Sequence, residues 1–135
     1  MGAVDQQATE LMHSAMPFTR DLGIEVLEST TSVVSTRLAW AAEKCTAGGA
    51  MHGGALMALA DATGGMCAFL NLPEGGTSTS TIESKTNFFR PLTAGNATAI
   101  AQPLHIGRRT IVVETEIRGD NDKLVAKVTQ TQAVL

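Results

Sequence analysis

The sequence predicts an α+β fold in which an antiparallel sheet wraps around one long central helix. Two observations support this fold class. Residues 55–70 are apolar nearly all round, which is typical of a helix that is covered on most of its sides. Much of the remaining chain consists of short runs rich in β-branched or alternating apolar residues, separated by turn residues, which favours strands paired as antiparallel neighbours.

The expected elements follow one another along the whole chain. Residues 9–16 predict a short amphipathic helix, which Pro17 ends. Two strands come next, then the apolar helix, and then four strands after a turn that contains Pro73, Gly75 and Gly76. The strands are expected at residues 23–28, 32–40, 79–90, 96–104, 110–118 and 124–134.

Length and composition indicate one globular domain over residues 1–135, with residues 1–20 as an N-terminal helical segment. The net charge of −3 offers no basic field for nucleic acid or an anionic membrane, so we expect neither as a partner. Two widely separated cysteines and no recognisable secretory segment lead us to expect a cytoplasmic protein. Three histidines without paired spacing lead us to expect no metal site.

Asp61 is the residue most suggestive of chemistry. It is the only charged residue between Gly53 and Leu70. A carboxylate on an apolar, buried helix costs free energy unless it is hydrogen-bonded or functional. A structural carboxylate, or an exposed position on the helix, explains the same pattern about equally well. Asp61 is therefore a candidate catalytic residue, and the residue pattern alone leaves its role open.

The run His52-Gly53-Gly54 stands where the apolar helix begins. A helix start offers free backbone N–H groups and a favourable dipole to a developing oxyanion, and glycine lets a ligand approach closely. A flexible junction between loop and helix is the alternative interpretation. A lipase-like hydrolase lacks support because no Gly-x-Ser-x-Gly segment is present, and a P-loop lacks its Gly-Lys-Ser/Thr.

The spacing of Gly53 and Asp61 predicts a shared site. Eight positions on one helix correspond to about 12 Å along its axis, so both residues cannot touch one reacting carbonyl. If both are catalytic, a second chain must complete each site. A sheet wrapped around one helix also leaves a long edge strand, which the pairing of two protomers would cover. Together these arguments predict a dimer at least.

Arg108 and Arg109 follow Gly107 in an expected turn between two strands. Adjacent arginines can hold phosphates by paired hydrogen bonds, although a solvated turn is the more common reason for such a pair. Arg90 before Pro91 is equally ambiguous. Neither Cys45 nor Cys67 has a nearby base, so both are interpreted as buried small hydrophobic residues.

Three segments together resemble the hotdog-fold thioesterase superfamily, of the 4-hydroxybenzoyl-CoA and phenylacetyl-CoA (PaaI-like) type. They are the helix-start run from His52 to Asp61, the strand-end run from Asn87 to Gly95, and the turn Gly107-Arg108-Arg109. The similarity extends over roughly residues 23–134. It implies a hotdog fold, a homodimer with shared active sites or a homotetramer built from two dimers, and hydrolysis of an acyl-CoA thioester.

The resemblance also implies roles for individual residues. Asp61 would act as general base on water or as nucleophile, and the Gly53 N–H would polarise the thioester carbonyl. Thr81 would orient the attacking water, and Thr46 stands where many relatives carry asparagine. The expected catalytic residues are His52, Gly53, Asp61, Thr81 and Thr46, and the expected contacts to substrate and coenzyme A are Gly54, Glu83, Arg90, Pro91, Gly107, Arg108 and Arg109.

Two other functions stay open at the level of the sequence. A hotdog hydratase or dehydratase would use His52 together with a carboxylate on the β-carbon of an enoyl-CoA. A non-catalytic acyl-CoA-binding protein would be compatible with Thr46 in place of asparagine. For the thioesterase, aryl groups such as phenylacetyl or hydroxybenzoyl are among the candidate acyl groups. No cofactor is expected, because coenzyme A is part of the substrate.

Overall fold

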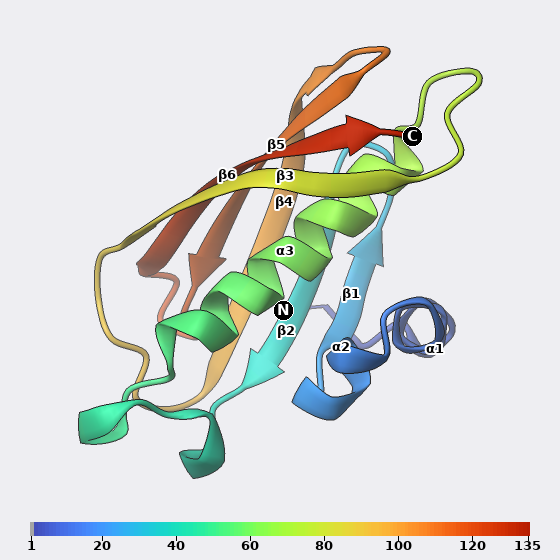
Figure 1. Cartoon of the computed structure of the whole chain (residues 1–135). Coiled ribbons are helices and arrows are strands. Elements are labelled where there is room, and N and C mark those ends of the chain that lie inside the picture. The colour runs from blue at the N-terminus through green and yellow to red at the C-terminus, as the bar shows by residue number, and fades with distance from the viewer. Residues whose placement is uncertain (1) are drawn as a thin grey trace.

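The computed structural model describes residues 2–135, which form a curved sheet around one long helix (Figure 1). The elements are α1 (Gln6–Ala15), α2 (Pro17–Leu22), β1 (Glu25–Ser29), β2 (Val34–Ala39), the short 3-10 turns Ala42–Lys44 and Ala47–Gly49, α3 (Gly53–Leu70), β3 (Thr79–Phe88), β4 (Asn96–Ile106), β5 (Thr110–Arg118) and β6 (Leu124–Val134). The predicted strands and the central helix are all present, with ends shifted by a few residues.

The N-terminal segment differs most from the prediction. α1 begins at Gln6, because the Asp5 carboxylate accepts a hydrogen bond from the Ala8 N–H at 3.0 Å and caps the helix. α1 ends before Pro17 as predicted, but Pro17 itself begins the second helix α2, which the sequence analysis missed. Proline suits a first helical position because its φ is already helical and its missing N–H would have no partner there.

The six strands pair antiparallel in the order β1-β2-β4-β5-β6-β3. The sheet curls around α3, while α1 and α2 lie outside it beside β1 (Figure 1). The predicted α+β hotdog arrangement is therefore confirmed. β3 lies at one edge of the sheet, so one side of its backbone has no strand partner within residues 2–135.

The inner face of the sheet is formed by every second residue of β2, β4, β5 and β6. On β4 these inward residues are Ala97, Ala99 and Ala101, all fully buried. Their small side chains let α3 approach the middle of the sheet, where Leu56 and Leu59 of the helix fill the core. Packing against this face fixes the position of α3 and of every side chain it carries.

α3 is buried only on its inner face, which corrects the prediction of a helix covered on most sides. Gly54, Met57 and Asp61 follow one another at helical spacing on the outer face and are exposed. With 18 residues and a mean hydropathy of 1.3, α3 is long and apolar enough to cross a membrane. In this fold, however, 44% of the helix is buried inside the protein. An apolar helix face left uncovered in one chain is typical of a subunit interface.

Candidate active site

Asp61 lies where the outer face of α3 meets the edge strand β3. Its Oδ1 accepts a hydrogen bond from the Thr81 hydroxyl at 2.7 Å and another from the Gln130 side-chain amide at 3.0 Å. The Gln132 amide donates in turn to the Thr81 hydroxyl oxygen at 2.5 Å. Within residues 2–135, Asp61 Oδ2 accepts no hydrogen bond. Protein donors thus hold one carboxylate oxygen, and the other is free to act on a ligand.

The register between β3 and β6 brings these side chains together. Thr81 lies opposite Gln132, and a β-bulge follows between Thr81 and the exposed Glu83. Such bulges re-aim the side chains beside them. Gln130 and Gln132 occupy inward positions two residues apart on β6, so both face α3, and they are 0% and 1% exposed.

Asp61 is exposed in the single chain, which corrects the expectation that this carboxylate is buried. That expectation followed from treating every side of α3 as covered. Asp61 instead occupies the uncovered face of the helix, and its partner Thr81 belongs to the strand whose outer edge is open. A second chain placed along that edge would enclose the carboxylate.

The start of α3 offers one free backbone donor. His52 precedes the helix, and its Nδ1 accepts a hydrogen bond from the Gly54 N–H at 2.8 Å, so this histidine caps the helix. The Gly53 N–H makes no hydrogen bond within the described chain. The Phe88 ring packs against Gly53, since a Cβ there would lie 3.1 Å from Phe88 Cζ. Gly53 is therefore the helix-start residue with an N–H left for a carbonyl oxygen.

An open depression of about 340 Å³ adjoins this helix start and is lined mainly by apolar and aromatic side chains. The lining residues are Met51, Gly53, Leu56, Phe88, Phe89, Arg90, Pro91 and Leu92. The Arg90 guanidinium donates to the Leu124 carbonyl at 2.6 Å, which holds this cation at the start of β6. The depression could receive an apolar group next to the Gly53 N–H.

Thr46 lies in the loop that leads into α3. An isolated bridge between Cys45 and Met51 closes this loop, and the Thr46 N–H donates to the Ala50 carbonyl at 2.9 Å. The Thr46 side chain is exposed, and its hydroxyl makes no hydrogen bond within residues 2–135. Its hydroxyl is therefore accessible to a ligand near the helix start.

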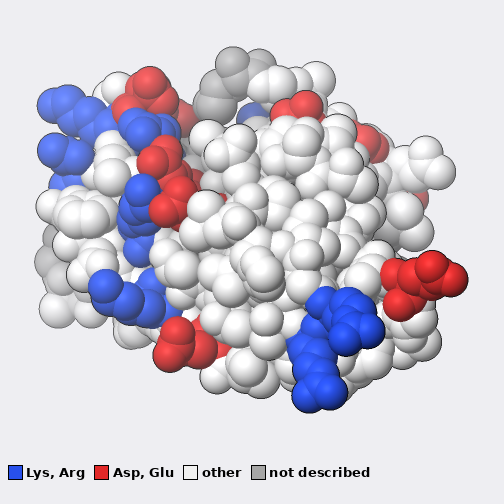
Figure 2. Space-filling view, turned by 90° about the horizontal axis from the view of Figure 1, so that it is seen from above, with Lys and Arg blue, Asp and Glu red and all other residues white. Residues whose placement is uncertain are grey.

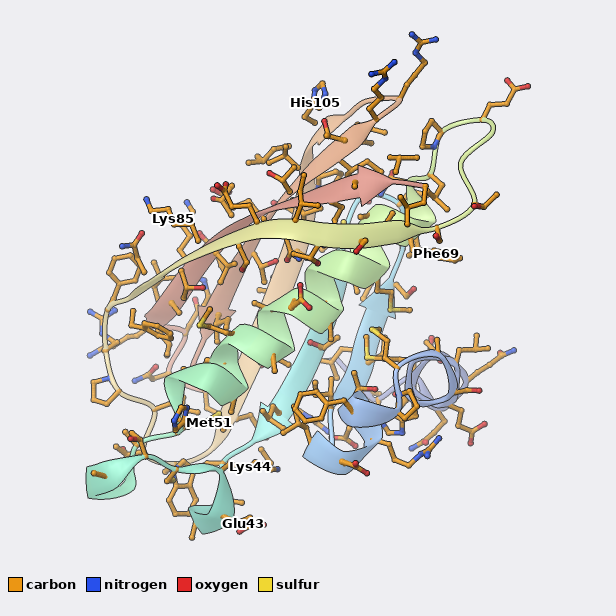
Figure 3. The ribbon with its side chains drawn as sticks, in the orientation of Figure 1. Glu43, Lys44, Met51, Phe69, Lys85 and His105 are labelled. Atoms are coloured by element: carbon orange, nitrogen blue, oxygen red, sulfur yellow. The ribbon has the colours of Figure 1, made fainter. Side chains whose placement is uncertain are left out.

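The Gly107-Arg108-Arg109 turn lies at the opposite end of the molecule from the start of α3. Figure 3 shows His105, just before this turn, far from Met51, just before the helix. Both arginines are exposed. One chain therefore does not bring the arginine pair and the helix start together.

Charged side chains are dispersed over the surface. Figure 2 shows acidic and basic groups intermixed along one side of the face it presents, and a separate basic group beside a large uncharged area. Within residues 2–135, three ion pairs lie on the strands: Arg37–Glu25, Arg118–Glu116 and Lys127–Glu114. Residues 2–135 contain no group of three or more histidine, cysteine or acidic side chains that could hold a metal ion.

The two cysteines differ in their surroundings. Cys67 is buried in the core, and this burial raises the pKa of its thiol to about 11, so it is inert near neutral pH. Cys45 is only half-buried, which corrects the prediction that both are buried.

Sequence reasoning missed Gln130 and Gln132. The available signal was the alternation of β6, in which residues 126, 128, 130 and 132 share the inward face. An amide at an inward position costs free energy unless its hydrogen bonds are used, so two glutamines in that row point to a buried polar partner.

Comparison of the sequence with known proteins identifies the family to which the chain belongs. A family model described as the thioesterase superfamily matches residues 48–126. A curated relative from Haemophilus influenzae, provisionally named an esterase, is 34% identical over 87 residues. That match covers 64% of this chain and 62% of the relative, so the chain matches less than two thirds of the relative's length.

Solved structures share the arrangement of sheet and helix. A thioesterase from Haemophilus influenzae superimposes with a TM-score of 0.88 at 25% identity, over 100% of this chain and 92% of that one. The PaaI protein from the phenylacetic acid degradation operon of E. coli gives a TM-score of 0.84 at 23% identity, over 96% and 92% of the two chains. The second likeness concerns the fold alone.

Proposed function

Because the chain belongs to the thioesterase superfamily and has its hotdog fold, we propose that it hydrolyses an acyl-CoA to a free acid and coenzyme A. One observation carries this proposal: the Asp61 carboxylate is held on one oxygen by Thr81 and open on the other, on the helix whose start carries the free Gly53 N–H. A positioned base or nucleophile and an oxyanion donor are the groups that acyl transfer to water requires.

In the proposed reaction, the thioester carbonyl oxygen accepts a hydrogen bond from the Gly53 N–H of one chain. Asp61 of a second copy takes a proton from water, whose oxygen adds to the carbonyl carbon, or the carboxylate attacks that carbon itself. The C–S bond then breaks and the coenzyme A thiolate leaves. In the general-base route the thiolate takes up the proton that Asp61 removed from water. In the nucleophilic route the acyl group is left on Asp61 as an anhydride, and a water molecule hydrolyses it, which releases the acid, regenerates the carboxylate and supplies the proton for the thiolate. The Thr81 oxygen accepts one hydrogen bond from Gln132, so one lone pair remains for the attacking water.

We propose a homodimer that forms along the open edge of β3, or a tetramer of two such dimers, in the cytoplasm. Pairing there would cover the exposed face of α3 and satisfy the unpaired backbone of β3. Each site would then combine Gly53 of one chain with Asp61 of the other. Arg108 and Arg109 are the proposed contacts to the coenzyme A phosphates. Both residues are exposed, and within residues 2–135 neither forms an ion pair with an acidic side chain, so both guanidinium groups can bind a phosphate.

The test measures the free thiol that the purified protein releases from short-chain, long-chain and aromatic acyl-CoA substrates. We expect hydrolysis of at least one class. Asp61→Asn should lower kcat about a hundredfold or more, because the amide keeps the size of the side chain but cannot act as base. Asp21→Asn, which changes an exposed carboxylate on α2, is the matched control and should leave turnover unchanged.

Three outcomes would contradict the proposal. Binding of acyl-CoA without thiol release from any substrate would indicate a binding protein. Hydration of an enoyl-CoA in place of hydrolysis would indicate a hydratase, although the Nδ1 of His52 is already engaged in capping α3. Near-normal hydrolysis by Asp61→Asn would exclude this carboxylate from the reaction.

A further inference from the structure

Two buried glutamines of β6 converge on the carboxylate of Asp61. Gln130 donates directly to Asp61 Oδ1, and Gln132 reaches the same oxygen through the Thr81 hydroxyl. We propose that Gln130 and Gln132 are positioning residues, which fix Oδ1 so that Oδ2 is the oxygen presented to the substrate. This inference rests on the proposed function, because it assigns a role within the same site.

The direction of each hydrogen bond follows from the chemistry of the groups. A hydroxyl has one hydrogen to donate. Since the Thr81 oxygen accepts from the Gln132 amide, its hydrogen is directed towards Asp61 Oδ1. The Gln130 amide likewise turns its nitrogen towards the carboxylate, because its oxygen there would place two acceptors together. Both donors therefore favour one rotation of the carboxylate group.

The placement of Gln130 is not explained by the stability of the fold. Its side chain is fully buried, and its Oε1 has no hydrogen-bond partner in the described structure. An unpartnered buried amide oxygen destabilises a fold, and an apolar residue such as the neighbouring inward Val128 would avoid this cost. The hydrogen bond to Asp61 is the contact that explains why a glutamine occupies this position.

Gly64 makes this placement possible. A Cβ at Gly64 would overlap Gln130 Oε1, so the amide occupies space that any other residue of α3 would fill. Gly64 lies three residues after Asp61, nearly one helical turn along, which sets the amide beside the carboxylate. The helix thus supplies both the carboxylate and the recess for the side chain that orients it.

The test replaces Gln130 by methionine, which keeps the length of the side chain and removes its donor. In the hydrolysis of the best acyl-CoA substrate, we expect kcat to fall about tenfold or more with KM changed by less than about threefold, as is usual for residues that orient a reacting group. Gln102→Met, on the exposed part of β4, is the matched control and should keep both constants. Gln132→Met should also lower kcat with little change in KM, and this variant replaces Gln130→Met in the test if Gln130→Met does not fold.

A double-mutant cycle separates positioning from structural support. If Gln130 acts through Asp61, the methionine should cost nothing further in the Asp61→Asn background. A full kcat in Gln130→Met, or an equal loss in the Asp61→Asn background, would overturn the proposal.

A nuclear magnetic resonance readout does not depend on activity. The side-chain N–H₂ signal of Gln130 should shift on Asp61→Asn and stay unchanged on Asp21→Asn. If wild-type protein hydrolyses no acyl-CoA, the proposed function fails, and this signal still decides whether Gln130 holds Asp61. An unchanged signal on Asp61→Asn would overturn the positioning role.

Discussion

Asp61 has its hydrogen-bond donors in place within a single chain. Thr81 and Gln130 hold Oδ1, but the residue as a whole is exposed in the single chain. In open water a carboxylate interacts weakly with a bound reactant because the high dielectric screens its charge. Exclusion of water strengthens the same interactions and protects the reacting bond. The carboxylate thus has its orientation from its own chain and still lacks enclosure.

Cys67 supports a prediction on stability against pH. Burial raises the pKa of its thiol from 9.0 to about 11, so the folded state keeps the proton where the unfolded state releases it. The stability contributed by the protonated thiol is present below pH 9 and is lost as the pH rises from 9 towards 11. Denaturant unfolding across this range should show the wild type losing more stability than Cys67→Ala.

The control for this prediction lies in the comparison of the two curves, since other groups titrate equally in both proteins. Parallel loss of stability in wild type and Cys67→Ala would contradict it. A thiol reagent at pH 8 should modify the half-buried Cys45 well before Cys67.

At the scale of elements, α3 carries two adjacent glycines with different surroundings. A Cβ at Gly65 would meet nothing within 4 Å, whereas a Cβ at Gly64 would overlap the Gln130 amide. Glycine is unfavourable inside a helix, by about 1 kcal/mol relative to alanine. The two positions therefore form a matched pair in which only Gly64→Ala displaces a side chain of the same chain.

We expect Gly65→Ala to raise the free energy of unfolding by up to about 1 kcal/mol and to keep turnover. Gly64→Ala gains the same helix propensity but must displace Gln130, so it should be less stable than Gly65→Ala and lose turnover about tenfold. Unfolding by denaturant and thiol release measure the two effects. Equal turnover of both variants would show that the recess at Gly64 has no part in catalysis.

At the scale of the whole molecule, the candidate site is divided. The start of α3 and the arginine turn after His105 lie at opposite ends of the molecule (Figure 3), and Asp61 lies near the middle of α3. Since Gly53 and Asp61 are about 12 Å apart along one helix, one chain alone does not present both to one carbonyl. A complete site requires two chains if both residues act.

Complementation between two inactive variants tests this division. Gly53→Pro removes the proposed donor but suits the first helical position, and His52, with ψ of 134°, already has the extended conformation that precedes proline. Asp61→Asn removes the base from the other half of the site. Each variant alone should be nearly inactive, and a mixture refolded together should recover about a quarter of wild-type turnover, because random pairing leaves one intact site in half of the dimers.

Absence of recovery in a mixture that forms heterodimers would show that one chain carries a whole site. Gly53→Ala keeps the N–H and should lose less turnover than Gly53→Pro. The added Cβ in either variant requires only that the half-exposed Phe88 ring move slightly.

Local patterns predicted most of the elements for physical reasons that act over short distances. Alternation on the strands and the apolar run of α3 report which faces are buried, so the sheet and the helix could be expected. The predicted first residue of α1 was wrong because a single capping residue, Asp5, determines where the helix begins. The helix α2 was missed because Pro17 was interpreted only as the end of a helix and not also as the start of the next one. The prediction that α3 is covered on most of its sides was wrong, because composition does not determine how many sides of an apolar helix a sheet covers.

By itself the sequence determined the class of fold, the resemblance to a family, and Asp61 as the lone acid of the central helix, since these depend on residue types and nearby spacing. Only the tertiary structure decided what surrounds that acid. Gln130 lies 69 residues from Asp61 along the chain, and it reaches the carboxylate because β6 pairs with β3 and Gly64 leaves room. Such contacts depend on strand order and register, which no local pattern encodes.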